Sequence, residues 1–261
     1  MASGTGRRTI AVTGSASGIG AEVRRQLEGG NARVIGVDLR GQEVEADLAT
    51  PAGRSTAIAA VRDACRGALD GLVCCAGLGP QFKPAESIVS VNYFGAVALF
   101  DGLREILAGG SDPAAVAVSS NSASISPGAD GPIAAACLEG DEAAATAAAS
   151  GNGVAAYSSS KLALARWVRR NAVAAPWAGA GIRLNAVAPG ATLTPLLQGG
   201  LDDEKLGPAI RGLPIPLGGV GSPEQIASAI VFLLGPESTF CCGTILFADG
   251  GSDALIRPNA I

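Results

Sequence analysis

Short apolar segments alternate with longer amphipathic segments along most of the chain. The short segments are rich in β-branched residues and bounded by Gly or Asp, which predicts buried parallel strands. They lie at residues 9–13, 33–37, 71–75, 115–118, 183–187 and 244–247. The Ala-rich amphipathic segments between them are long enough to be crossover helices, at 18–28, 51–65, 89–107, 154–177 and 223–234. The alternation predicts an α/β fold: a single-domain, Rossmann-type, doubly wound parallel sheet flanked by helices on both faces.

Local signals mark the starts of two of these helices. Thr50 is placed to cap a helix that has Pro51 at its first position, and Ser222 with Gln225 has the spacing of a capping box. Both signals agree with the predicted helices.

Two long connections interrupt the alternation. Residues 126–153 contain an Ala-rich stretch at 141–150 with high helix propensity, which predicts an inserted helix covering one flank. Residues 191–221 are rich in Gly and Pro and follow the carboxyl end of a strand, where open α/β sheets bind ligands. We therefore expect a substrate lid there. No linker divides the chain, so residues 1–261 are expected to form one domain.

The amino-acid composition excludes some classes of catalytic and metal site and makes some classes of partner less favoured. The 261 residues are 48% hydrophobic and 16% charged, enough for one large core, and they include no histidine. The absence of histidine excludes Ser-His-Asp hydrolysis and His-ligated zinc. The net charge is −4 and no dense Lys/Arg cluster is present, which argues against nucleic acid or an anionic membrane as partner. A small-molecule ligand is favoured.

The cysteines and the chain start bear on location. Six cysteines without a C-x-x-C spacing suggest neither a metal site nor a disulfide framework, and a reducing cytoplasm is expected. No apolar run approaches the ~18 residues of a membrane span, and Met1 to Arg8 is too short and polar for an export signal.

A glycine-rich turn lies between the first strand and the first helix. Gly14, Gly18 and Gly20 would allow a tight turn, close approach of the backbone to a pyrophosphate, and tight helix packing. Asp38 ends the second strand, where a carboxylate can accept hydrogen bonds from both ribose hydroxyls of an adenosine. This favours NAD. Arg40 could instead clamp a 2′-phosphate, so NADP stays open, and a turn without ligand is the structural alternative.

Tyr157 and Lys161 are four residues apart and so share one helix face. A phenol beside a fixed cation can carry out proton chemistry without histidine, because the cation lowers the phenol's pKa. Such a pair also occurs by chance on surface helices. The pair Ser119 and Ser120 ends a preceding strand, which adds hydroxyl groups near the same edge of the sheet.

The order of these motifs across the chain resembles the short-chain dehydrogenase/reductase family. The resemblance covers essentially the whole chain and is strongest to the bacterial 3α-hydroxysteroid dehydrogenase/carbonyl reductase branch. The segments that carry it include 46–48, 75–81, 92–96, 183–185 and 188–197.

The resemblance implies four catalytic residues. Tyr157 would be the general acid in carbonyl reduction and the base in alcohol oxidation, and Lys161 would lower its pKa and bind the nicotinamide ribose. Ser120 would hold the substrate oxygen, and Asn92 would kink its helix and hold a water that links Lys161 to solvent. The alternatives for the serine are Ser119, Ser122 and Ser124.

The resemblance also implies the cofactor contacts. Asp47 and Leu48 would flank the adenine, Gly77 would touch its ribose, and the loop after the strand at 183–187 would hold the carboxamide. The full set is Gly14, Ser15, Ser17, Gly18, Ile19, Gly20, Asp38, Leu39, Asp47, Leu48, Cys75, Ala76, Gly77, Tyr157, Lys161, Pro189, Gly190, Thr192 and Thr194.

One departure from the family is the pair Cys74 and Cys75, which replaces the common Asn-Asn. Contacts to the cofactor there would be mostly through the backbone. We interpret these cysteines, and Cys241 with Cys242, as buried small hydrophobic residues, with a redox role as the alternative.

The function expected from the residues and the resemblance is NAD-dependent interconversion of a secondary alcohol and a ketone. Leu193, Leu196, Leu197 and Leu213 make the lid apolar, which favours a hydroxysteroid or another bulky substrate. The alternatives are a reductase for a quinone or a 3-oxoacyl thioester, and a non-catalytic dinucleotide-binding protein. The resemblance also implies a homodimer or homotetramer, and the inserted segment is expected to alter the interface.

Overall fold

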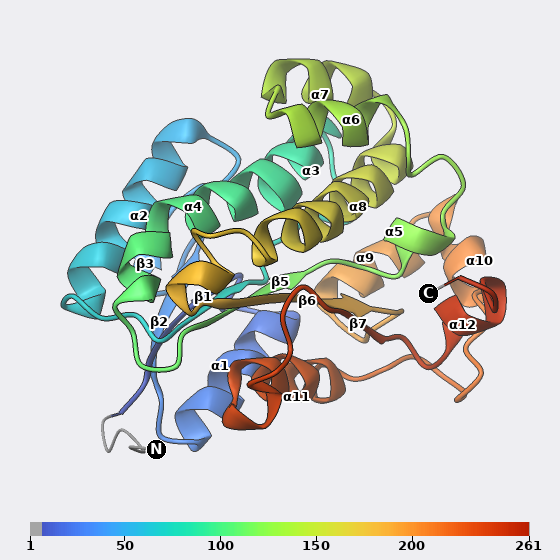
Figure 1. The fold of residues 1–261 in the computed structure, drawn as a ribbon. Helices are drawn as coiled ribbons and strands as arrows, with labels where there is room; N and C mark the ends of the chain where they lie inside the picture. Colours follow the sequence, from blue (N-terminus) through green and yellow to red (C-terminus); the bar gives the residue numbers. More distant parts are fainter. Residues whose placement is uncertain (1–6, 261) are drawn as a thin grey trace.

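A computed structural model describes residues 7–260 and shows a parallel sheet with helices on both faces (Figure 1). The predicted absence of an export signal in Met1 to Arg8 falls largely outside the described residues. Within them, seven strands pair in the order β3-β2-β1-β4-β5-β6-β7, all parallel. They are β1 (Thr9–Thr13), β2 (Arg33–Asp38), β3 (Val44–Glu45), β4 (Gly71–Cys74), β5 (Ala114–Val118), β6 (Arg183–Pro189) and β7 (Ile245–Ala248).

The predicted fold class is confirmed, and six of the strands lie within one or two residues of their predicted bounds. β3 was not predicted, because a strand of two residues is too short to show a period. It pairs with the end of β2, where Val37 faces Val44.

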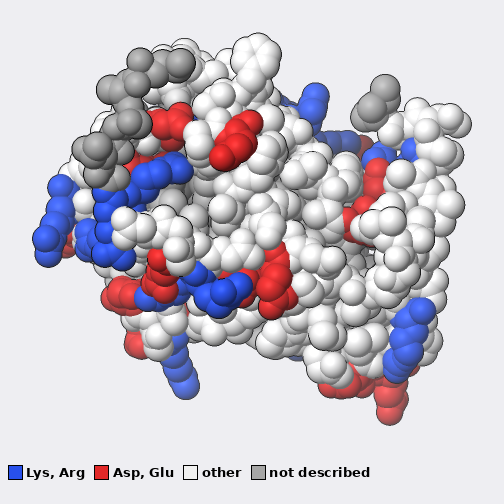
Figure 2. Space-filling view, turned by 90° about the horizontal axis from the view of Figure 1, so that it is seen from below, with Lys and Arg blue, Asp and Glu red and all other residues white. Residues whose placement is uncertain are grey.

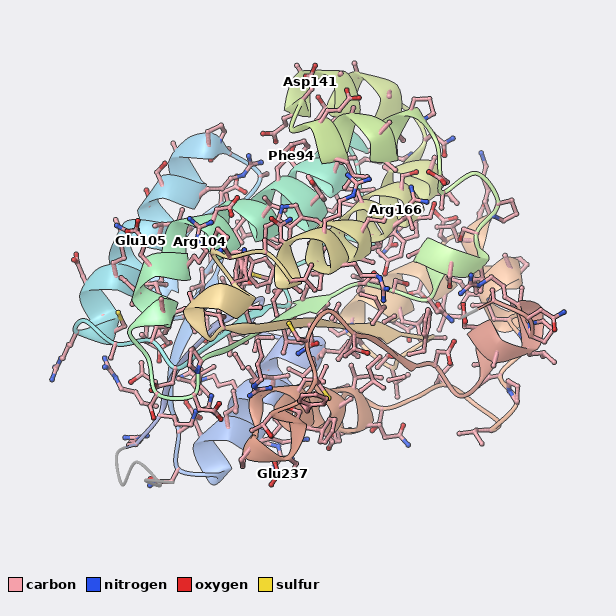
Figure 3. The ribbon with its side chains drawn as sticks, in the orientation of Figure 1. Phe94, Arg104, Glu105, Asp141, Arg166 and Glu237 are labelled. Carbon is pink, nitrogen blue, oxygen red and sulfur yellow. The ribbon has the colours of Figure 1, made fainter. Side chains whose placement is uncertain are left out.

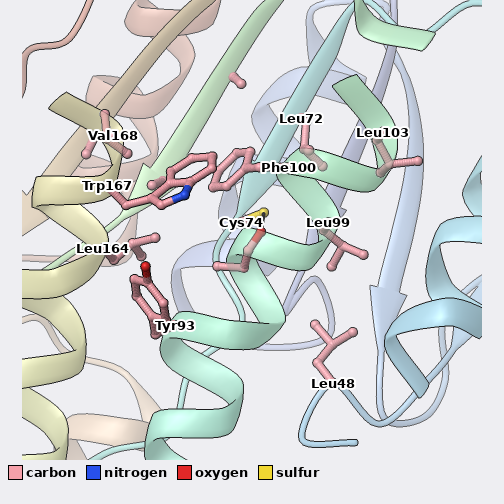
Figure 4. Packing of buried hydrophobic residues seen from close by; sticks show 14 of the residues in the cluster. Leu48, Leu72, Cys74, Tyr93, Leu99, Phe100, Leu103, Leu164, Trp167 and Val168 are labelled. Atoms are coloured by element: carbon pink, nitrogen blue, oxygen red, sulfur yellow. Dashed lines mark hydrogen bonds between the residues drawn. The ribbon is translucent and has the colours of Figure 1, made fainter. Parts of the chain in front are cut away.

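The helices divide between the two faces of the sheet according to their apolar stripes. α1 (Gly18–Gly29) and α11 (Pro223–Leu234) cover one face, and α2 (Pro51–Cys65), α4 (Ala96–Ala108) and α8 (Gly153–Ala172) cover the other. On the second face the rings of Phe100 and Trp167 stack with centroids 5.5 Å apart (Figure 4). The buried cluster that contains these two rings holds α4 and α8 against the sheet.

Both predicted helix starts are present. The Thr50 hydroxyl accepts a hydrogen bond from Gly53 N at 3.0 Å, and Ser222 N donates to Gln225 Oε1 at 2.8 Å. Each bond pairs a backbone N–H group that the start of a helix would otherwise leave without a partner.

Two predicted helices differ from the structure. The helix predicted at 154–177 ends at Ala172, since Pro176 cannot continue it, and Trp177 is fully buried outside the helix. The helix predicted at 89–107 consists of α3 (Glu86–Val89), the π-helical turn η1 (Ser90–Gly95) and α4. A π-helical turn widens the hydrogen-bond ladder and often marks a functional site.

The segment at 126–153 contains two helices where one was predicted. They are α6 (Pro132–Glu139) and α7 (Glu142–Ala149), separated by Gly140 at φ +78°. The prediction missed the start of α6 at Pro132 because it was based on the high helix propensity of the longer alanine run that follows. The pair packs on α8 and α3, at the top of the view in Figure 1.

The segment at 191–221 is also partly helical, with α9 (Pro195–Asp202) and α10 (Leu206–Arg211). The remaining short elements are α5 (Ser122–Ile125), η2 (Ala178–Ala180), η3 (Pro236–Ser238) and α12 (Ser252–Ile256). In residues 7–260 no helix combines the length and the apolar character that crossing a bilayer requires. In the view of Figure 2, Lys and Arg side chains lie beside Asp and Glu side chains rather than forming a separate basic area.

Candidate active site

A cleft of about 790 Å³ lies over the carboxyl ends of the strands. Gly14 follows β1, Cys75 follows β4, Ser120 follows β5 and Pro189 ends β6, and all four line it. This edge is where doubly wound sheets bind their ligands, because loops and helix starts converge there.

The cleft brings together most of the residues proposed from the sequence. Every proposed cofactor residue except Ser15 lines it, and so do the three proposed catalytic residues Ser120, Tyr157 and Lys161. Ser15 is buried beneath the glycine turn, and its hydroxyl lies 3.0 Å from Gln42 Oε1. Asn92 is the other proposed residue outside the cleft wall.

The glycine turn has no room for side chains at two positions. Gly14 has φ +68°, and a Cβ placed on it would lie 2.8 Å from the backbone of Ala76. A Cβ on Gly20 would lie 2.1 Å from the carbonyl oxygen of Gly14. The hydroxyl of Thr13, a residue the sequence did not single out, accepts hydrogen bonds from Cys75 N at 3.1 Å and Ala76 N at 3.0 Å. The start of α1 is thereby held directly against the ends of β1 and β4.

Asp38 ends β2 at the rim of the cleft. Its carboxylate accepts hydrogen bonds from Leu39 N at 2.7 Å and Ala16 N at 3.0 Å, which fixes it beside the glycine turn. Arg40, the alternative phosphate clamp, is exposed and lies outside the cleft wall. The charge at this rim is therefore negative.

Tyr157 and Lys161 project from one face of α8 toward the end of β5. Lys161 is buried, and its Nζ donates to Val118 O at 2.7 Å. The Ser119 hydroxyl donates to Lys161 O at 2.8 Å, so it joins β5 to α8 and is engaged with the backbone. The Ser122 hydroxyl instead donates to Ser120 Oγ at 3.0 Å, which puts a second hydroxyl in the site.

The pKa values of this pair differ from the sequence-based expectation. Burial raises the pKa of Tyr157 above its ordinary value, and a hydrogen bond with Ser120 offsets this only in part. Burial also lowers the pKa of Lys161 to about 8, against the opposing influence of the Cys75 and Cys74 thiols. Desolvation dominates the pKa of both groups in this structure, and the lowering of the Tyr157 pKa by Lys161 stays a prediction. Tyr157 is therefore a protonated phenol at neutral pH.

Asn92 lies in η1, behind the cleft wall. Its Oδ1 accepts from Leu78 N at 2.8 Å and its Nδ2 donates to Leu78 O at 3.1 Å. A Cβ on Gly77 would lie 3.2 Å from Asn92 Oδ1 and 3.4 Å from Lys161 Nζ. Asn92 thus holds the loop after β4, which lies between it and Lys161, and the distorted helix it was expected to occupy is present.

The other half of the cleft is apolar. Leu196, Leu197 and Leu213 line it, whereas Leu193 is 58% exposed and does not, which corrects that part of the prediction. Among the described residues of the wall, the charged side chains are Asp38, Asp47 and Lys161, all on the cofactor side or at the catalytic centre. Further apolar wall residues that the sequence did not reveal are Phe82, Ile125, Pro127, Val154, Ile210 and Ile256.

The loop that carries Ser120 is held by the C-terminal segment. Asn121 Nδ2 donates to Asp249 Oδ2 at 3.3 Å, and the Ser124 hydroxyl hydrogen-bonds the carboxylate of Asp253. Asp253 also pairs with Arg257 at 2.9 Å. Ser124 is thus engaged away from the cleft. More than 120 residues separate these partners, so no spacing in the sequence could have indicated the contacts.

Gln81 is a second residue that the sequence left without a role. Its Nε2 donates to Leu196 O at 3.0 Å, joining the loop after β4 to α9, and its Oε1 is buried without a partner among the described residues. It borders the apolar half of the cleft.

The cysteines are all free thiols. Burial raises the pKa of Cys75 to about 12, so this residue of the cleft wall carries no thiolate at neutral pH. Cys74 is buried as expected, whereas Cys75 and Cys241 are half-buried and Cys242 is exposed, so the interpretation as buried residues is confirmed for Cys74 and contradicted for Cys242.

Comparison with known proteins agrees with this geometry. A family model described as enoyl-(acyl carrier protein) reductase matches residues 142–253. The chain is 45% identical over 254 residues to 3-alpha-hydroxysteroid dehydrogenase/carbonyl reductase of Comamonas testosteroni, covering 96% of this chain and 98% of the relative. It is 33% identical to cis-4-hydroxycyclohexanecarboxylate dehydrogenase of Sinomonas cyclohexanicum, covering 95% and 97%.

A solved structure is similar over nearly the whole chain. The 3-alpha-hydroxysteroid dehydrogenase of Pseudomonas sp. B-0831, complexed with NADH, matches with a TM-score of 0.94 at 50% identity, covering 97% of this chain and 100% of that one. The relatives are dehydrogenases and reductases, which leaves the non-catalytic alternative without support. The chain belongs to the short-chain dehydrogenase/reductase family and is an oxidoreductase that interconverts alcohols and ketones with a nicotinamide cofactor.

Proposed function

We propose that this enzyme uses NAD in preference to NADP and acts on a bulky, uncharged, apolar alcohol or ketone, with a hydroxysteroid as the leading candidate. The observation that carries the proposal is the presence of Ser120, Tyr157 and Lys161 in the same cleft as the glycine turn. The relatives from Comamonas and Pseudomonas are named for 3-alpha-hydroxysteroids, and their 45–50% identity supports the same substrate class.

The cofactor half fits a dinucleotide. The absence of side chains at Gly14 and Gly20 lets the turn pack against Ala76 and against the first turn of α1, so that the start of α1 borders the cleft. Unpaired N–H groups and the helix dipole favour an anion such as a pyrophosphate there. Asp38 would accept hydrogen bonds from the adenosine ribose, and it would repel a 2′-phosphate. Because Arg40 lies outside the cleft wall, no described cation of the wall offsets that repulsion.

The catalytic half can move one proton to and from a substrate oxygen. The bound nicotinamide supplies or accepts the hydride. Ser122 N and the Ser122 hydroxyl both donate to Ser120 Oγ, and the Ser120 hydroxyl hydrogen-bonds Tyr157. The Ser120 proton can therefore pass from the phenol oxygen to a substrate oxygen beside it and stabilise charge developing there. Tyr157 donates its proton to the same oxygen during reduction and removes it during oxidation. The Lys161 ammonium stabilises the phenolate that forms.

The wall composition supports an uncharged substrate. No cation of the described wall lies in the apolar half, so a substrate carboxylate would be buried there without a partner. This separates the present cleft from one suited to a hydroxy acid. A quinone or a 3-oxoacyl thioester is the remaining alternative from the sequence.

Initial rates test both parts of the proposal. Wild type and Asp38→Ala would be assayed with NAD and NADP on a 3α-hydroxysteroid, and with NADH on a quinone and a 3-oxoacyl thioester. We expect wild type to prefer NAD and the steroid, and Asp38→Ala to lose most of the preference for NAD. A wild-type preference for NADP would contradict the cofactor assignment, and faster turnover of the quinone or thioester would contradict the substrate class.

We also infer a homodimer whose interface differs from the tetramer common in the family. The α6–α7 pair packs over α8 and α3 and covers a flank that would otherwise be free. On the opposite side, Phe232, Phe240 and Phe247 of α11, β7 and the loop between them are exposed, which suits burial against a second copy. Light scattering tests this inference, and a tetramer would contradict it.

The location we propose is the cytoplasm. All six thiols are free, including the exposed Cys242, which fits a reducing compartment. Cell fractionation with an antibody against the chain tests this.

A further inference from the structure

The guanidinium of Arg54 joins parts of the molecule that are far apart in the sequence. Arg54 lies in the first turn of α2 and is only 7% exposed. Its Nε donates to Leu48 O at 2.8 Å, and its Nη2 donates to Ala49 O at 3.2 Å and to Ser90 O at 3.1 Å. It therefore binds both the loop at 46–50, which forms the adenine side of the cleft, and the start of η1.

A carboxylate from the α6–α7 segment completes the coordination of Arg54. Glu142, the first residue of α7, accepts two parallel hydrogen bonds from the guanidinium, at 2.6 and 2.7 Å. Burial opposes the charged form of Glu142, but hydrogen bonds from Arg54 and Ser90 hold its pKa below the ordinary value. The guanidinium also lies 5.9 Å from the ring centroid of Phe94, which Figure 3 shows beside the α6–α7 pair.

The loop held by Arg54 is tightly packed. The side chain of Leu48 belongs to the buried cluster drawn in Figure 4. A Cβ on Gly95 would lie 3.2 Å from Leu48 Cβ, and one on Gly53 would lie 1.9 Å from Asp47 O. Because Asp47, Leu48 and Ala49 all line the cleft, a small shift of this loop changes the surface that faces the adenine.

Arginine retains its charge in proteins, so a buried guanidinium requires a partner of opposite charge. Among the described residues, Glu142 is the carboxylate that pairs with Arg54. Without it, the guanidinium would be drawn toward water, and its bonds to Leu48 O and Ala49 O would loosen.

We propose that Arg54 and Glu142 are positioning residues for the adenine half of the cofactor, and that the α6–α7 segment contributes to cofactor affinity through Glu142. The inference rests on the proposed binding of NAD in this cleft. It gives the inserted segment a role in the chemistry of its own subunit, beyond covering a flank.

The decisive variant is Glu142→Gln, which keeps the shape of the side chain and removes its charge. We expect the KM for NAD and the inhibition constant of ADP-ribose to rise about tenfold, equivalent to about 1.4 kcal/mol. The kcat at saturating NAD and the kcat/KM for nicotinamide mononucleotide, which lacks the adenosine half, should change less than twofold. If Glu142 only stabilised the fold, Glu142→Gln would weaken the binding of ADP-ribose and of nicotinamide mononucleotide by the same factor.

Asp130→Asn is the matched control. Asp130 makes the same two-bond pair with Arg166 of α8, at 2.6 Å for each bond, but both side chains are exposed. It should leave the KM for NAD unchanged. Should Glu142→Gln fold poorly, Glu142→Asp keeps the charge and shortens its reach, and it should raise the ADP-ribose constant by a smaller factor.

The outcomes separate the two proposals. Wild type that neither binds ADP-ribose nor turns over with NAD would overturn the proposed function itself. If wild type binds ADP-ribose but both Glu142 variants behave like Asp130→Asn, only the positioning role is overturned. Equal losses for ADP-ribose and nicotinamide mononucleotide in those variants would overturn it as well.

Discussion

The two halves of the cleft are built in different ways. In the cofactor half the backbone itself is the surface, because Gly14 and Gly20 have no space for a side chain and Thr13 holds the ends of two strands together. In the substrate half the surface consists of side chains, many of them from α9, α10 and α12 and others from α5, α8 and loops. There Gln81 supplies a single hydrogen bond to the backbone of α9.

This difference separates what is fixed by the fold from what can be changed. A backbone surface moves only if the strands and α1 move, so substitutions there should affect folding and cofactor binding together. A side-chain surface can be altered one residue at a time. We therefore expect substitutions in the substrate half to change substrate preference and to leave NAD affinity unaffected.

The largest effect is expected where the halves meet. Tyr157→Phe removes the proton donor but keeps the ring and its packing, so kcat should fall by about 10² to 10⁴-fold in both directions. The Kd for NADH, measured by fluorescence titration, should remain within twofold of wild type. Substantial remaining turnover would contradict the assigned role of the phenol.

Two alanine substitutions compare the halves directly. The Cβ of Gly20→Ala would lie 2.1 Å from a backbone oxygen, so the strand or α1 must move, at a cost of about 1–3 kcal/mol and a raised KM for NAD. The Cβ of Gly200→Ala would come closest to the end of the Ile210 side chain, at 2.8 Å, which can rotate, and its next contact, with Gln81 Oε1 at 3.8 Å, is ordinary packing. Urea unfolding gives the free energy of unfolding of each variant, and the KM for NAD and the KM for the substrate show which half of the cleft each substitution affects. An equal loss in the free energy of unfolding for the two variants would contradict the distinction between a backbone surface and a side-chain surface.

The pH dependence of kcat/KM tests the Tyr157–Lys161 pair, where the two halves of the cleft meet, without a mutation. Lys161 carries its charge below its pKa of about 8 and loses it above. The kcat/KM for ketone reduction at saturating NADH should therefore be constant below pH 8 and fall about tenfold per pH unit above it, because the ammonium stabilises the phenolate. A profile that stays flat from pH 6 to pH 10 would contradict this assignment.

The smallest effect is expected in the substrate half. Leu196→Ala shortens an apolar wall residue of α9, and the kcat/KM for a steroid should fall about fivefold, or about 1 kcal/mol. The same ratio for cyclohexanol, which is too small to reach that wall, should change little, and so should the KM for NAD. A rise in the KM for NAD would show that the halves are coupled.

The same division explains what the sequence revealed. The glycine turn, Asp38 and the Tyr157–Lys161 pair were found because each depends on local spacing next to a recognisable strand or helix. Ser15 lies outside the cleft wall, and its position in the motif does not reveal that its hydroxyl turns toward Gln42.

The features that the sequence did not reveal depend on contacts between distant segments or on burial. The pKa of Tyr157 could not be inferred from its spacing to Lys161, because desolvation by the surrounding fold dominates it. The role of Glu142 depends on a partner 88 residues away. The lid leucines show the same limit, because Leu193 points to solvent while its neighbours on α9 line the cleft.

The contacts of α12 have a practical consequence for handling the enzyme. This helix supplies Ile256 to the cleft, and Asp249 and Asp253 hold the loop that carries Ser120. A purification tag fused close behind Arg257 could disturb the contacts that hold the loop of Ser120, whereas β1 begins at the edge of the sheet opposite the cleft. Expression vectors that add residues only at the amino end should therefore yield the more active preparation.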